Sequence, residues 1–148
     1  MPERETLERA KEDAREGKSP STQAGEFVRE EMHHIREGKH GARSPQQAIA
    51  IGLSKARRSG VKLSPPKGPA SVRKKAEQDA RAAKEGKGRG HKTSAKRSRA
   101  VEHALQRESH TAASHDALAR HARESAIKRG KQSRRKSAAK AARTRKAA

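Results

Sequence analysis

The chain has 148 residues, 38 of them Lys or Arg and 17 Asp or Glu, so its formal net charge is +21 at neutral pH. It has no cysteine, which excludes disulfides and thiolate zinc sites, and its one aromatic residue excludes the stacking platforms of RNA-recognition and cold-shock modules. Only 14 of the 148 residues are Leu, Ile, Val or Phe. This share is far below the value of about 20% under which a highly charged chain is expected to be disordered. We therefore expect a partly disordered protein that seeks polyanions.

Charge divides the sequence into two zones. Residues 1–60 carry 12 basic and 10 acidic side chains, a net charge of +2, whereas residues 61–148 carry 26 and 7, a net charge of +19. Three prolines and a glycine in KLSPPKGPAS, residues 62–71, are typical of an extended linker. We predict a small helical module over residues 1–63, a linker over 64–71 and a basic arm over 72–148.

Two short helices are expected first, over residues 3–16 and 22–37. Each ends at a glycine, Gly17 and Gly38, that can take the left-handed conformation closing a helix, and a degenerate copy of this pattern returns at Gly86. The second helix has the better apolar face, with the spacing of one helical stripe, formed by Ala24, Phe27, Val28, Met32 and Ile35.

The stretch ARSPQQAIAIGLSKARRSG, residues 42–60, predicts a third helix. Ser44 stands at the cap position, Pro45 at the first helical position, and Gln47 three residues after the cap, while Gly60 ends the helix. Its apolar face should lie against the second helix, with Gly52 allowing close approach; the face consists of Ala48, Ile49, Gly52, Leu53 and Ala56.

The predicted fold class is mostly α. A small N-terminal helical module of two or three short helices is followed by a largely disordered or marginally helical basic arm. The module offers about ten sizeable apolar side chains, few for a self-sufficient core, so it is expected to depend on a homodimer or a protein partner.

Polyanion binding is the function that the basic arm indicates. Its last 21 residues contain ten basic side chains and no acidic one, which suits a nucleic-acid backbone. The densest candidates are Arg134, Arg135, Lys136, Lys140, Arg143, Arg145 and Lys146. At the end of the third helix, Lys55, Arg57 and Arg58 are candidates for further phosphate contacts.

A second candidate anion site precedes the third helix. Lys39, His40 and Arg43 lie before free backbone N–H groups and the positive end of the helix dipole, an arrangement that suits a phosphate. The same side chains would also keep a loop soluble. Sequence-specific readout is less supported, because the connection GKHGARS is about twice the 3 to 4 residues of a helix-turn-helix.

The eight histidines do not predict a metal site. His33, His34 and His40 are close in sequence, but adjacent residues on a helix diverge by about 100° and no Cys or well-placed carboxylate completes a zinc set. No arrangement predicts catalysis either, since Ser-His-Asp at 114–116 is a local run rather than a triad brought together by folding. We expect no metal, no cofactor and no enzymatic activity.

The segment REGKHGARSPQQAIAIGLSKARRSGVKL, with the preceding SPSTQAGEFVREEMHHI, resembles a group of short basic bacterial proteins catalogued as a domain of unknown function. Their mark is a QAIAIGLSKAR-type helix after a Gly-Lys-rich loop, matched here over residues 47–57. The resemblance covers about residues 15–65 and implies a bacterial source but no activity. The arm is similar in composition to Lys/Ala-rich histone-like tails.

The sequence thus favours a non-enzymatic protein that binds the DNA backbone without sequence preference, of nucleoid-associated type. Two alternatives stay open: an RNA- or ribosome-associated accessory protein, and a protein-binding adaptor with a polycationic tether. The amino terminus is charged from Glu3 and no apolar run approaches the roughly 18 residues of a membrane span, so we expect a cytoplasmic protein located at the nucleoid.

Overall fold

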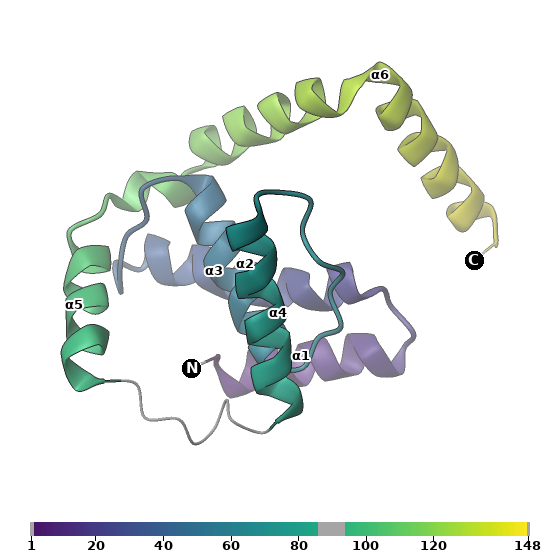
Figure 1. The fold of residues 1–148 in the computed structure, drawn as a ribbon. Coiled ribbons are helices and arrows are strands. Elements are labelled where there is room, and N and C mark those ends of the chain that lie inside the picture. The colour runs from purple at the N-terminus through teal and green to yellow at the C-terminus, as the bar shows by residue number, and fades with distance from the viewer. Residues whose placement is uncertain (1, 86–93, 148) are drawn as a thin grey trace. The chain divides into compact units, whose positions relative to one another are not determined.

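The computed structural model describes residues 2–85 and 94–147. Within them the chain forms six α-helices and one short 3-10 helix (Figure 1): α1 (Arg4–Arg15), α2 (Pro20–Arg36), α3 (Pro45–Arg58), α4 (Ala70–Lys84), α5 (Ala95–Gln106), η2 (His110–Ala113) and α6 (His115–Ala147). Contacts group residues 1–113 into one compact unit and residues 114–148 into another. None of the described helices combines the length and the apolar character that crossing a bilayer requires.

The predicted fold class was wrong. The described residues form an all-α structure that ends in a long helix, α6, instead of a disordered or marginally helical arm. The reason is that helical hydrogen bonds are local and that Ala, Lys and Arg, which dominate this part of the chain, have high helix propensities. A shortage of bulky apolar side chains therefore did not exclude helices here. The predicted boundaries at residues 63 and 71 stay a prediction.

The beginning of α3 follows the predicted capping chemistry, and α2, which was expected from residue 22, begins at Pro20 with the same chemistry. Ser19 Oγ accepts a hydrogen bond from Thr22 N (3.3 Å), and Ser44 Oγ accepts one from Gln47 N (3.2 Å), each with a proline at the next position. Gln47 in turn reaches back, its Oε1 accepting from Arg43 N at 2.8 Å. The predicted helix ends are also confirmed, because the glycines there have positive φ: Gly17 (71°), Gly38 (76°) and Gly60 (95°). Gly86 lies outside the described residues.

Helices α1, α2 and α3 share a small core in which Phe27 is the largest side chain. Phe27 is buried with Ala10, Ala24 and Ala56, and partly buried apolar residues surround them: Leu7, Leu53, Val61 and Leu63. Burying a side chain of this size contributes roughly 1.5–3 kcal/mol. The core is built mostly from alanine, so α2 and α3 must approach each other closely.

Gly52 is a point of close approach between α2 and α3, as the sequence predicted. A Cβ at this position would lie 2.8 Å from Val28 Cα and 3.0 Å from the Phe27 carbonyl oxygen. We expect Gly52→Ala to lower the free energy of unfolding by about 1–3 kcal/mol, since an extra methyl group in a packed interface forces the helices apart. Urea denaturation followed by circular dichroism measures this change.

Gly25 on α2 provides the matched control. A Cβ there would have nothing within 4 Å, so Gly25→Ala should raise stability by up to about 1 kcal/mol through helix propensity alone. Equal effects of the two substitutions would contradict the close approach at Gly52.

Two later segments complete the first unit. Helix α4 packs against α3, where Ser54 Oγ donates to Asp79 Oδ2 and Ala76 is buried. Residues 105–113 lie against the loop between α2 and α3, through hydrogen bonds from Gly41 N to the Leu105 carbonyl (2.9 Å) and from Ala42 N to the Ser109 carbonyl (3.0 Å). Both segments belong to what the sequence assigned to the basic arm.

Helix α6 consists of two straight parts joined by a bend, which is visible in the yellow-green end of Figure 1. Gly130 has a non-helical backbone there, with φ 73° and ψ 163°, a region open essentially to glycine alone. The bend thus separates a first part, residues 115–129, from a second, residues 131–147. All residues from 131 to 146 are exposed.

Candidate functional site

The second part of α6 carries the densest positive charge among the described residues. Its cations, called the α6 cations below, are Lys131, Arg134, Arg135, Lys136, Lys140, Arg143, Arg145 and Lys146. At 1.5 Å per residue they extend over about 24 Å, and at 100° per residue they occupy about two thirds of the helix circumference. The remaining third is an uncharged stripe of Ser133, Ser137, Ala141 and Thr144. Seven of the eight were predicted from sequence, and the structure brings those seven together on one helix.

No carboxylate accompanies the α6 cations. The second unit, residues 114–148, contains 12 Lys or Arg and only Asp116 and Glu124 as acidic side chains, both before the bend. Nothing within this part of the helix therefore compensates the eight charges. Such a helix repels itself and is stabilised by any polyanion that neutralises it.

Several cations of the first unit are in a different situation, because they already contact carboxylates. Lys18 Nζ lies 2.8 Å from Asp13 Oδ1, and Arg9 Nε lies 2.6 Å from Glu26 Oε2. Hydrogen bonds to Asp13 and Glu16 raise the pKa of Lys18, and the hydrogen bond to Glu26 raises that of Arg9. These side chains are thus held in the charged form by internal partners.

The cations predicted near the end of α3 do not form one group with a common direction. Lys55 is mostly buried, with its ammonium 2.7 Å from Glu31 Oε2 and 3.3 Å from Glu30 Oε1. Arg58 is half-exposed and its Nε lies 4.0 Å from Asp79 Oδ1, while Arg57 is partly buried. Lys55 therefore has an internal role that the sequence did not indicate.

The predicted anion site before α3 has carboxylates beside each of its three residues. Lys39 Nζ lies 3.0 Å from Glu37 Oε2, and His40 Nε2 lies 3.3 Å from Glu31 Oε1. Arg43 Nη2 lies 3.5 Å from Glu108 Oε1. Hydrogen bonds to Glu37 raise the pKa of Lys39. The three side chains thus face acidic partners.

A polar cluster connects α1, α2 and α3 around the two adjacent glutamates of α2, Glu30 and Glu31. Both glutamates are buried, with 3% and 1% of their surfaces exposed, and Lys55 lies between them. Glu30 Oε2 also accepts a hydrogen bond from Glu3 N at the start of α1 (3.2 Å). Within the described residues Glu31 Oε2 has no hydrogen-bond partner, so its contact with Lys55 is an ion pair without hydrogen-bond geometry.

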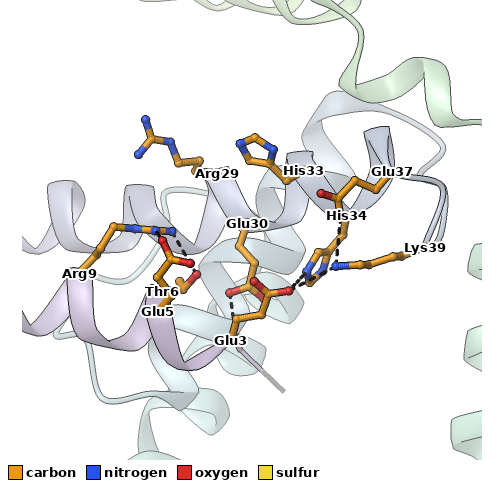
Figure 2. A pocket seen from close by; sticks show the side chains of 10 residues that line it. All are labelled: Glu3, Glu5, Thr6, Arg9, Arg29, Glu30, His33, His34, Glu37 and Lys39. Atoms are coloured by element: carbon orange, nitrogen blue, oxygen red, sulfur yellow. Dashed lines mark hydrogen bonds and ion pairs between the residues drawn. The ribbon is translucent and has the colours of Figure 1, made fainter.

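A pocket of about 320 Å³ opens beside this cluster (Figure 2). In Figure 2 the carboxylate of Glu3 meets two side chains of the pocket, His34 through Nε2 at 2.9 Å and Lys39 through Nζ at 3.3 Å. Hydrogen bonds from His34 and Lys39 hold the pKa of Glu3 below its ordinary value. The pocket is lined by side chains of both charges, so it does not select an anion or a cation by net charge alone.

Three side chains of the cluster have the composition of a metal centre. Glu31, His34 and His40 each offer one ligand atom, and these atoms lie within 4.8 Å of one another. The sequence interpretation found no carboxylate for the histidines, whereas the structure places Glu31 beside both. The signal that could have found it is Glu-x-x-His on α2, since residues three apart share a helix face.

The part of the chain that matches a known family contains α2, α3 and their connecting loop. Residues 15–68 match the model of a family of unknown function (DUF6496). The chain thus carries this domain of unknown function, as its resemblance predicted, over nearly the predicted span. No curated protein and no solved structure matches the chain.

The DUF6496 segment contains the polar cluster almost entirely. Glu30, Glu31, His34, His40 and Lys55 all lie within residues 15–68, and only Glu3 comes from outside it. The α6 cations lie outside the segment. None of the comparisons bears on the likeness of the C-terminal part to histone-like tails.

Proposed function

We propose that the chain is a non-enzymatic protein that binds the backbone of nucleic acid, with duplex DNA preferred, through α6. The observation that carries this proposal is that the α6 cations are exposed with no carboxylate among them, whereas Arg9, Lys18 and Lys55 of the first unit contact internal carboxylates. Neutralising phosphates with such cations releases condensed counterions, which supplies most of the free energy of nonspecific binding.

The shape of α6 supports DNA over RNA. An α-helix is about 10–12 Å in diameter and enters the major groove of B-DNA, which is about 12 Å wide, but not the deep and narrow major groove of duplex RNA. Cations over two thirds of the circumference would meet phosphates on both walls of the groove. The uncharged stripe of Ser133, Ser137, Ala141 and Thr144 would then face away from the DNA.

The same residues support binding without sequence preference. Bidentate contacts to bases require side chains held in a fixed direction, whereas none of the α6 cations has a described partner within its own unit that would orient it. Phosphate contacts tolerate such freedom. Location at the nucleoid is part of the same proposal.

Fluorescence anisotropy with the full chain and two duplexes of unrelated sequence tests this function. If most of the eight α6 cations contact phosphates, affinity falls roughly 10³- to 10⁴-fold between 50 and 200 mM salt. The two duplexes should bind within a few-fold of each other. Binding that hardly responds to salt would contradict the proposal, and stronger competition by ribosomal RNA than by duplex DNA would assign the chain to RNA.

A further inference from the structure

We propose that Glu31, His34 and His40 form a binding site for a divalent transition metal ion of the zinc class. The three ligand atoms lie within 4.8 Å of one another, and His40 Nε2 is 3.3 Å from Glu31 Oε1. With metal–ligand bonds of about 2.0–2.1 Å, two ligands of a tetrahedral zinc ion are separated by about 3.3–3.5 Å. One pair already has this separation, and each remaining distance exceeds it by at most about 1.5 Å.

His40 is held by a hydrogen bond between its Nδ1 and the Gly41 carbonyl oxygen, and its other nitrogen, Nε2, faces Glu31 as an acceptor. His40 Nδ1 lies 3.1 Å from the Gly41 carbonyl oxygen, which can only accept, so Nδ1 carries the proton. In the neutral ring Nε2 is then a lone pair that faces a carboxylate oxygen, also an acceptor. Two acceptors at 3.3 Å require a cation between them, either a proton or a metal ion. Backbone carbonyls bonded to the far nitrogen are the usual support of a metal-binding histidine.

His34 has the corresponding support from a carboxylate. Its Nε2 lies 2.9 Å from Glu3 Oε1, and a hydrogen bond donated to Glu3 leaves Nδ1 with the free lone pair. Carboxylate, histidine and metal in this order are a recurrent arrangement that fixes the ring and strengthens it as a ligand. Glu31 and His34 come from one face of α2, in the Glu-x-x-His spacing that helical metal proteins use.

The charges of the cluster also favour a cation. Glu30 and Glu31 are both buried and share the single ammonium of Lys55, which leaves one negative charge in excess when the histidines are neutral. Lys55 contacts Glu31 Oε2, so Oε1 stays available as the ligand atom. Burying a carboxylate without a cation is costly, and a metal ion would compensate it.

The donor set selects the class of ion. Two imidazoles and one carboxylate suit zinc and its neighbours, whereas magnesium and calcium require oxygen ligands almost exclusively. Three protein ligands leave a fourth position of the tetrahedron for water. His34 lines the pocket of Figure 2 and is 13% exposed, so an ion can enter from that side.

Zinc titration of the full chain, followed by competition with a chromophoric chelator, tests the site. We expect one zinc ion per chain at this site, and at least a tenfold loss of its affinity in His34→Gln and in His40→Gln. His33→Gln is the matched control, because His33 is the exposed neighbour on the same helix and is not part of the ligand set. Its zinc affinity should stay within twofold of that of the unchanged chain.

Several results would overturn the metal site. One is the absence of stoichiometric zinc binding, and another is a zinc affinity in His34→Gln and His40→Gln that equals that of the unchanged chain. A third is a loss of affinity in His33→Gln as large as in those two variants, which would indicate adventitious binding by surface histidines. Should the variants fail to fold, Co²⁺ added to the unchanged chain decides: strong visible absorption of four- or five-coordinate cobalt supports the site, and the weak absorption of six-coordinate cobalt refutes it.

Discussion

Replacing Arg134, Arg135 and Lys136 together by glutamine is expected to weaken binding to duplex DNA roughly 10²- to 10³-fold at 0.1 M salt. Each phosphate contact contributes about 0.9 to the slope of log K against log salt concentration, hence a factor of about 8 at this concentration. The same substitutions should reduce that slope by about 2.7. All three side chains are exposed, so helix α6 itself should persist. Anisotropy titrations at several salt concentrations give both quantities.

A matched triple on α1 separates the position of the charge from its amount. Arg4→Gln, Lys11→Gln and Arg15→Gln also lower the net charge from +21 to +18, and these three side chains are exposed as well. We expect less than a threefold change in affinity, because α1 belongs to the nearly neutral part of the chain. Equal losses in the two triples would mean that binding follows net charge, and the role proposed for α6 would be wrong.

Helix beginnings and ends were predictable because they depend on residues close together in sequence. Ser44 and Gln47 are three residues apart, and their hydrogen bonds form as soon as the first turn of α3 forms. The close approach at Gly52 was predictable for a related reason, since a glycine on an apolar helix face has few other uses. The apolar face of α2 was likewise correct at Phe27 and Ile35, which are buried.

The folded state of the later segments was not predictable from the count of bulky apolar side chains. Ala76, Ala112 and Ala113 are buried. Alanine thus contributes to a packed surface, although it is not among the bulky apolar side chains that were counted. Asp79 is buried as well and accepts a hydrogen bond from Ser54, 25 residues away in sequence. Such contacts depend on tertiary packing, which no local pattern of charge or hydropathy contains.

The polar cluster was missed for the same physical reason. Glu30 and Glu31 look like solvated charges in the sequence, and Lys55 looks like a phosphate contact. They meet because α2 and α3 pack closely, and this packing removes all three from water. The ion pairs between α2 and α3 form because the two helices approach each other, and the sequence contains no local pattern for them. Its one weak local signal for this cluster is the Glu-x-x-His spacing of Glu31 and His34.

Lys55→Met is expected to destabilise the first unit by about 3–5 kcal/mol. Removing one partner of a buried ion pair leaves the other charge without compensation, and here two glutamates lose their shared cation. Small domains have total stabilities of about 5–15 kcal/mol, so the substitution removes a large part of the total. Urea denaturation of the full chain, followed by helical circular dichroism at neutral pH, measures the loss.

Methionine keeps most of the volume of the lysine stem, so Lys55→Met removes mainly the charge. Two further variants show whether the lost charge causes the loss of stability. Lys62→Met replaces an exposed lysine shortly after α3 and should leave the denaturation midpoint unchanged. Adding Glu30→Gln and Glu31→Gln to Lys55→Met removes the uncompensated charges, so most of the lost stability should return, since buried ion pairs replaced as a whole cost little. If the triple variant were no more stable than Lys55→Met alone, lost packing of the lysine stem would explain the effect, and the two glutamates would not depend on Lys55 for charge compensation.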